Sequence, residues 1–294
     1  MKTQLFFLLL FFVTSCANNE NATTATSESA SVKKTIILAV DGGGIKGIIP
    51  AIILDSIEAK TGKPCYQLFD IIGGTSTGGI IAMGLTTPQP NTNQPFPASK
   101  IIQIYENDGA NIFVYQGAGI KQNYAKYYAS HKDKGIEPYL QKMLGSSLAL
   151  TDAFKATAKL PGSRIRQAFT TSYIVNSSGN AVQSPQAGKD YGPYLFNWYD
   201  AARNQSDNYY VWEATRGTSA APTYFPIANV GGGKAPRSAA AEKWAIDGGM
   251  MSNDPAVWGI TEAFRTGIAQ DLKDIIVISI GTGMYPGMAG IGIH

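Results

Sequence analysis

The chain has 294 residues, of which 44% are hydrophobic and 15% charged, so it can bury one large core. Its 32 glycines and 15 prolines predict many turns within that core-forming chain. The formal net charge of +3, without a dense run of Lys or Arg, argues against a nucleic-acid-binding protein. The same charge is compatible with approach to an anionic lipid surface.

The amino terminus predicts export. A positive start at Met1–Gln4 precedes the apolar run Leu5–Val13, which is too short for a bilayer span of about twenty residues. Residues 1–15 therefore read as a signal peptide. The sequence Val13-Thr14-Ser15-Cys16 resembles a bacterial lipobox, which implies cleavage before Cys16 and lipidation of its thiol; an ordinary signal peptide is the alternative.

The segment that follows Cys16 reads as a flexible tether over residues 17–33, because it is rich in Asn, Thr, Ser and Ala and has no apolar period. Ala17, rather than an aspartate, follows the cysteine. Together these features predict a lipoprotein of the cell envelope, anchored in the outer membrane.

From residue 34 onward, strand-like and helix-like segments alternate. The strand-like segments are 35–40, 69–72, 168–175 and 275–280; the helix-like segments are 48–60, 79–85, 100–111 and 136–144; residues 209–216 fit either, and 88–97 is a loop. This alternation favours an α/β fold with a mostly parallel sheet covered by helices on both faces. No internal boundary is evident, so 34–294 is expected to be one domain.

Two glycine-rich turns each follow a predicted strand and precede a predicted helix. They are Asp41–Gly47 and Gly74–Gly79. The second turn fits G-x-S-x-G, in which Gly74 and Gly78 permit a sharp turn that exposes the hydroxyl of Ser76. Ser76 is therefore the candidate nucleophile.

A serine nucleophile needs a base, and this chain has only two histidines. His131 lies in a polar stretch and His294 is the last residue, where a catalytic imidazole is poorly held. Asp247 follows an apolar run and precedes Gly248 and Gly249, which predicts a strand-end turn like the other two. A carboxylate whose pKa is raised by burial can accept the serine proton.

These motifs, in this order, resemble the patatin-like phospholipase domain. They are Asp-Gly-Gly-Gly-x-x-Gly at 41–47, Gly-Thr-Ser-Thr-Gly-Gly at 74–79 and Asp-Gly-Gly at 247–249, with supporting segments at 219–225, 253–256 and 279–283. The resemblance covers Thr35 to Gly283. It implies a patatin-like three-layer sandwich that hydrolyses acyl esters of phospholipids or other lipids.

By the same resemblance, Ser76 and Asp247 form a catalytic dyad. The turn of Gly42, Gly43, Gly44, Ile45 and Gly47 forms the oxyanion hole, chiefly through backbone N–H groups of Gly43, Gly44 and Ile45. Each such donor stabilises a transition state by on the order of 3 kcal/mol. No cofactor and no metal are expected, and the expected partners are an acyl-lipid substrate and, through the lipid anchor, a membrane surface.

Three other interpretations stay open. The Gly42-x-Gly44-x-x-Gly47 spacing fits a dinucleotide fingerprint, although the acidic residue expected about twenty positions later is absent. Ser76, Asp247 and His294 follow the chain order of an α/β-hydrolase triad. A non-catalytic, lipid-binding surface lipoprotein is the third. Cys65 is interpreted as a small buried apolar residue.

Overall fold

The computed structural model describes residues 34–116, 125–177, 191–233 and 237–283. The predicted signal peptide, Cys16, the 17–33 tether and His294 lie outside the described residues. Within the described ranges, no helix has both the length and the apolar character that a bilayer crossing requires.

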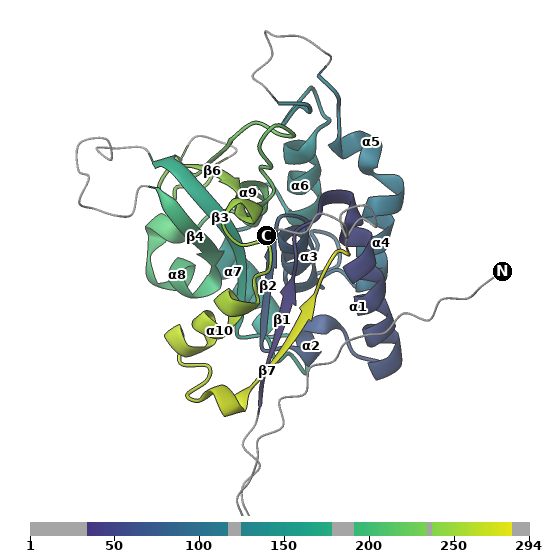
Figure 1. Cartoon of the computed structure of the whole chain (residues 1–294), viewed down its shortest axis with the longest axis vertical. Helices are drawn as coiled ribbons and strands as arrows, with labels where there is room; N and C mark the ends of the chain where they lie inside the picture. Colours follow the sequence, from purple (N-terminus) through teal and green to yellow (C-terminus); the bar gives the residue numbers. More distant parts are fainter. Residues whose placement is uncertain (1–33, 117–124, 178–190, 234–236, 284–294) are drawn as a thin grey trace, which may run out of the picture. The chain divides into compact units, whose positions relative to one another are not determined.

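The described residues form a seven-stranded sheet flanked by helices (Figure 1). The strands are β1 (Thr35–Val40), β2 (Ile71–Thr75), β3 (Gln167–Ser177), β4 (Gly192–Asn197), β5 (Ala228–Val230), β6 (Lys243–Asp247) and β7 (Ile275–Ile280). The α-helices are α1 (Ile48–Thr61), α2 (Cys65–Leu68), α3 (Thr77–Thr86), α4 (Ala98–Asn107), α5 (Gly109–Ile112), α6 (Ile136–Leu144), α7 (Leu150–Ala158), α8 (Trp198–Arg203), α9 (Val211–Thr218) and α10 (Ala256–Arg265).

Four strands form the parallel centre of the sheet, in the order β3-β2-β1-β7. Val40, at the end of β1, pairs with Gly74 on one side and with Ile280 on the other. The carboxyl ends of these strands therefore lie at one edge of the sheet, and both glycine-rich turns leave from that edge. The predicted α/β class with a mostly parallel sheet is confirmed.

The other three strands are antiparallel to their neighbours, which the sequence does not predict. β4 pairs with β3 over Phe169–Ile174, a stretch that overlaps the part of β3 paired with β2. β6 pairs with β3 from Ser172 onward, where β4 also still pairs. A strand has only two edges, so β2 and β6 must share one edge of β3 and β4 must occupy the other.

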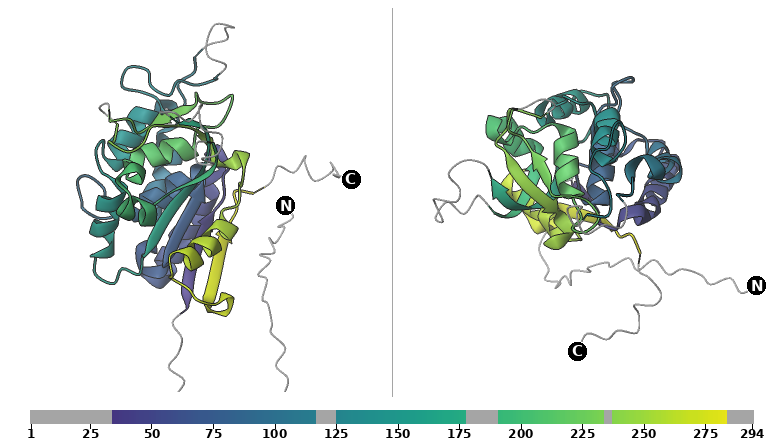
Figure 2. Two further views of the ribbon diagram at one scale, coloured as in Figure 1. Left: turned by 90° about the vertical axis from the view of Figure 1, so that its left-hand side faces the viewer. Right: turned by 90° about the horizontal axis from the view of Figure 1, so that it is seen from above.

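Helices lie on both faces of the sheet (Figure 2), and the side chains of its strands alternate between two cores, one on each face. Leu38 and Ile72 point into the larger core, which the helices including α3 and α9 cover. Ile37 and Ile71, their chain neighbours, point into a smaller core against α10. Burial on both faces explains why β1 is almost continuously apolar, as parallel strands are.

Two predicted helices differ in the structure. The segment predicted as one helix over 100–111 is two helices, because Asp108 interrupts the helical backbone between α4 and α5. The segment 209–216, which fits strand or helix by pattern, is helical as α9, with a capping box between Tyr210 and Glu213. The helices α7, α8 and α10 have no counterpart among the predicted segments.

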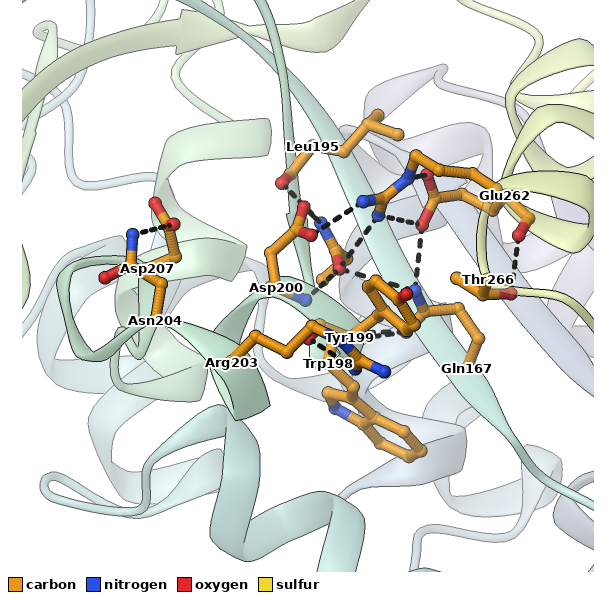
Figure 3. Close-up of polar contacts among 12 residues, drawn as sticks. Gln167, Leu195, Trp198, Tyr199, Asp200, Arg203, Asn204, Asp207, Glu262 and Thr266 are labelled. Carbon is orange, nitrogen blue, oxygen red and sulfur yellow. Dashed lines mark hydrogen bonds and ion pairs between the residues drawn. The ribbon is translucent and has the colours of Figure 1, made fainter.

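A buried polar cluster joins α10 to β3 and α8 (Figure 3). Glu262, 1% exposed, accepts hydrogen bonds from the Gln167 amide at 2.8 Å and from Arg265 at 2.6 and 2.7 Å. Arg265 also bonds Asp200 at 2.6 Å. These bonds satisfy a carboxylate that burial alone would destabilise.

Replacing Glu262 with alanine is expected to destabilise the fold by about 2 kcal/mol, because Gln167 and Arg265 lose their shared acceptor. The loss is smaller than for a fully buried ion pair because Arg265 keeps contact with water. Urea unfolding measures the change. The matched control is Glu106→Ala on an exposed position of α4, and equal losses in the two variants would contradict the assignment.

Candidate active site

Ser76 occupies the tight turn between β2 and α3. Its backbone has φ 54° and ψ −121°, a conformation that is strained for a residue with a side chain. The Ser76 N–H donates to Thr218 Oγ at 2.9 Å, and its carbonyl accepts from the N–H of Ile80 at 3.1 Å. The surrounding structure thus holds the serine in the strained turn that the G-x-S-x-G pattern predicts.

The two glycines of this turn are required by close approach of backbones. A Cβ on Gly74 would overlap the carbonyl of Gly78, and a Cβ on Gly78 would overlap the carbonyl of Val40. Because both obstacles are backbone atoms, a side chain at either position would displace the backbone of the turn that carries Ser76. The predicted roles of Gly74 and Gly78 agree with this packing.

Asp247 reaches Ser76 from the end of β6. The Ser76 hydroxyl is close enough to its carboxylate to lower the pKa of that group, and the Gly249 N–H donates a hydrogen bond to the carboxylate at 2.7 Å. Asp247 is only 6% exposed, and burial raises the pKa of its carboxyl, whereas the Ser76 hydroxyl, the Gly249 N–H and the charge of Arg216 lower it. The fold therefore brings together two residues that most of the domain separates in the chain.

Gly248 and Gly249 shape the turn after Asp247. Gly249 supplies the N–H that orients the carboxylate. Gly248 is buried against Thr171, on the strand to which Ser172 also belongs. Ser172 pairs with Asp247 across the sheet, and its hydroxyl donates to the Ile246 carbonyl at 2.8 Å. The position of Asp247 is thus fixed by both backbone and side-chain contacts.

Arg216 is a fully buried cation whose charge acts on Asp247. Its side chain is 0% exposed and bonds Glu137 at 3.2 Å and the Pro226 carbonyl at 2.6 Å. Burial lowers the pKa of the guanidinium, while Glu137 and Asp247 raise it. Arginine stays protonated in proteins, so this residue supplies a permanent positive charge that acts on the carboxylate of Asp247.

The first glycine-rich turn is held in place through Gly42. The Gly42 carbonyl accepts hydrogen bonds from Thr282 Oγ at 2.8 Å and from the Asn253 amide at 3.3 Å, and its N–H donates to the Asn253 carbonyl at 3.1 Å. Gly42 therefore supports the turn, since its N–H is already used. Gly47 ends the short helix η1 (Gly44–Gly47) and packs against Tyr105 and Thr77.

The next three residues of the turn border the serine. Gly43, Gly44 and Ile45 line the same cavity as Ser76. Within the residues that the structure describes, their backbone N–H groups have no acceptor. Free N–H groups beside a serine hydroxyl are the arrangement that can stabilise a developing oxyanion.

The cavity at Ser76 has a volume of about 770 Å³ and is mainly apolar. It extends from the glycine-rich turn to α4, α5 and α6 and to the loop after α9. Its apolar lining includes Ile80, Ile104, Ile112, Phe113, Ile136, Leu140 and Phe225. A cavity of this size and character fits an extended hydrocarbon group.

The other candidate residues considered from the sequence, Cys65 and His131, do not line the Ser76 cavity. Among the described residues, no group of three or more His, Cys, Asp or Glu side chains could hold a metal ion. Cys65 is buried and unpaired, as its interpretation as an apolar residue predicts. His131 is exposed, stacks on the ring of Tyr128 at 4.5 Å and does not line the cavity.

Several supporting residues were not assigned a role from the sequence. They are Thr218, which accepts from Ser76; Arg216, which faces Asp247; and Asn253 and Thr282, which hold Gly42. Asn253 and Thr282 lie in segments that carry the family resemblance, and that resemblance is the signal in the sequence that could have pointed to them. Nothing in the local pattern of α9 marks Arg216, because its importance comes from burial.

Comparison with known proteins decides the family. Residues 38–257 match the family described as Patatin-like phospholipase. The chain belongs to this family. Patatin group M-2 of Solanum tuberosum is 32% identical over 275 residues, covering 85% of this chain and 61% of that protein. Patatin-15 of the same plant is 31% identical over 271 residues, covering 84% of this chain and 60% of its own length.

This patatin-like chain therefore spans about three-fifths of the length of the curated relatives it matches. A structural similarity also exists to the crystal structure of VipD from Legionella pneumophila, with 12% identity and a TM-score of 0.44, over 85% of this chain and 50% of that one. The family predicted from the three motifs is confirmed.

Asp41, at the head of the first glycine-rich turn, carries a carboxyl oxygen that is buried without a hydrogen-bond partner among the described residues. Burial, followed by the charge of Asp254, raises the pKa of Asp41 to about 6. A carboxyl whose pKa is raised in the folded state holds a proton that the unfolded chain has lost. Ionisation of Asp41 therefore destabilises the fold.

Parent stability is expected to fall as the pH rises from about 4, near the unfolded pKa of aspartate, to the folded pKa of Asp41 at about 6. Asp41→Asn should lack this part of the slope and be more stable than the parent at pH values above it. Chemical unfolding at a series of pH values tests this. Asp133→Asn, an exposed loop substitution, is the control and should keep the parent slope.

Proposed function

We propose that this protein is a lipid acyl hydrolase of the phospholipase A or lysophospholipase type that uses a Ser76–Asp247 dyad. One observation carries the proposal: Ser76 lines an apolar cavity, and its hydroxyl is close enough to the buried carboxylate of Asp247 to lower the pKa of that group. The family supports the reaction class, since its members are described as patatin-like phospholipases. No cofactor takes part in the proposed reaction.

In the proposed first step, Ser76 Oγ attacks the ester carbonyl as its proton passes to Asp247. Partial desolvation makes Asp247 a stronger base than an exposed aspartate, because burial raises its pKa. The hydrogen bond from the Gly249 N–H to Asp247 Oδ1 keeps the carboxylate oriented. The carbonyl oxygen becomes negative as the new C–O bond forms.

Backbone N–H groups of Gly43, Gly44 and Ile45 stabilise that oxyanion in the proposal. The tetrahedral intermediate then collapses, and the alcohol part of the lipid leaves with the proton that Asp247 returns. Water, with its proton accepted by Asp247, hydrolyses the acyl-Ser76 ester in a second round of the same chemistry. The fatty acid leaves and the free serine is restored.

The localisation that goes with this function is also a proposal. The lipobox-like sequence before Cys16 supports lipidation of that thiol and an anchor in the outer membrane, with residues 17–33 as the tether. A lipid anchor would keep the hydrolase at a membrane surface, where phospholipids are concentrated. A membrane location is consistent with a lipid substrate, and each of the two proposals can be tested separately.

Hydrolysis of a p-nitrophenyl ester and of a phospholipid tests the dyad, using protein that lacks residues 1–16. Ser76→Ala and Asp247→Asn are each expected to lower kcat/KM by on the order of a thousandfold or more. Ser56→Ala and Asp271→Asn, both at exposed positions, are the matched controls and should retain activity.

The same assay separates the alternatives. Loss of activity in His294→Ala, with His131→Ala active, would replace the dyad with the Ser76, Asp247 and His294 triad. A folded parent that binds liposomes but hydrolyses neither ester would instead favour the non-catalytic lipoprotein.

Arg216 gives a second test, through the pH dependence of activity. Asp247 accepts a proton only when ionised, so kcat/KM should rise as the pH rises through its pKa. The positive charge of Arg216 lowers that pKa. Arg216→Met should therefore move the acidic limb of the kcat/KM profile to higher pH.

Arg216→Lys keeps the charge and should leave the limb close to its parent position. Arg164→Met removes a cation that pairs with Asp70, a residue that precedes β2 at the amino-terminal end of the sheet, and controls for general destabilisation. If the acidic limb of the kcat/KM profile is unchanged in folded Arg216→Met, the charge of Arg216 does not set the pKa of Asp247.

A further inference from the structure

A second cavity lies beside the one that contains Ser76. It has a volume of about 580 Å³ and a mixed lining, in which Lys100, Lys134 and Lys142 stand beside Phe96 and Met143. The Ser76 cavity differs from it in being lined mainly by apolar side chains. Residues of α4, α5 and α6 line both cavities.

Among the described residues, two line both cavities, Ile104 on α4 and Tyr139 on α6. Their neighbours on α4 divide between the cavities: Gln103 lines the second cavity and Tyr105 the Ser76 cavity. Ile104 is 7% exposed and belongs to the large core. The barrier between the cavities is therefore one side chain thick at these two positions.

Tyr139 is held in the barrier by a hydrogen bond. Its hydroxyl donates to Asp108 Oδ2 at 2.8 Å, and Asp108 lies at the break between α4 and α5. Burial and this bond raise the pKa of Tyr139, so the hydroxyl stays protonated and remains a donor at neutral pH. The helix break and the tyrosine together fix the ring between the two spaces.

We propose that Ile104 and Tyr139 limit the length of the acyl chain that this protein accepts, by closing the Ser76 cavity where it borders the second cavity. A chain that ends before these side chains gains affinity from each methylene it buries. A longer chain meets these two side chains and can bury no further methylene. This inference rests on the proposed function, because it takes the apolar cavity to be the acyl site.

Binding of saturated fatty acids of increasing length, from hexanoate to stearate, measures the limit without requiring turnover. Calorimetry on the full domain below the micellar concentration gives Kd for each length. In the parent, affinity should rise roughly fourfold per methylene and then stop rising at one length. That length is the breakpoint.

Ile104→Ala should move the breakpoint to longer chains by roughly two methylenes, because it removes most of one side chain from the barrier. Tyr139→Phe should leave the breakpoint in place, since the ring remains. The matched control is Ile136→Ala, an equally buried isoleucine that lines the apolar cavity alone. It should change affinity at every length and leave the breakpoint unchanged.

Circular dichroism checks that each variant is folded. Ile104→Val is the milder variant if Ile104→Ala does not fold, and it should move the breakpoint in the same direction by a smaller amount. A parent without a breakpoint, an unchanged breakpoint in folded Ile104 variants, or an equal shift in Ile136→Ala would each overturn the inference. Failure of the proposed function looks different: fatty acids bind with a breakpoint while no ester is hydrolysed.

Discussion

The site depends on a single constraint, which is that β2 and β6 share one edge of β3. β2 runs parallel to β3 and ends where Thr75 pairs with Thr171, and β6 runs antiparallel and ends where Asp247 pairs with Ser172. The two strands therefore point toward each other and stop at consecutive residues of their common neighbour. The residue after Thr75 is Ser76, so the backbone hydrogen bonds of β3 set the distance between Ser76 and Asp247.

Around this junction the structure holds several groups that would each be unstable alone. The backbone of Ser76 is in a conformation that costs on the order of 1–3 kcal/mol, and Asp247 and Arg216 are charged groups in the interior. Each has specific partners: Thr218 for Ser76, Gly249 for Asp247, and Glu137 with the Pro226 carbonyl for Arg216. The large apolar cores on both faces of the sheet provide the stability that such a site requires.

Local patterns in the sequence predicted the parallel centre well. The segments 35–40, 136–144 and 275–280 are a strand, a helix and a strand with the predicted bounds, because each has a clear period and a clear turn at its end. The break at Asp108 and the helix over 211–218 were not resolved by pattern, since short apolar periods fit more than one element. The antiparallel pairing of β4, β5 and β6 escaped prediction because pairing depends on partners far away in the chain.

The sequence by itself determined the chemical groups and their local backbone: a serine between Gly74 and Gly78, a glycine-rich turn after the first strand, and an aspartate before Gly248. These follow from steric limits that act over a few residues. Only the tertiary structure decided that β6 runs antiparallel and shares one edge of β3 with β2, that the buried charge of Arg216 acts on Asp247, and that Ile104 and Tyr139 line both the Ser76 cavity and a second cavity. Those features arise from contacts between distant segments, whose strength depends on burial and register, and neither quantity is encoded in any short stretch of the chain.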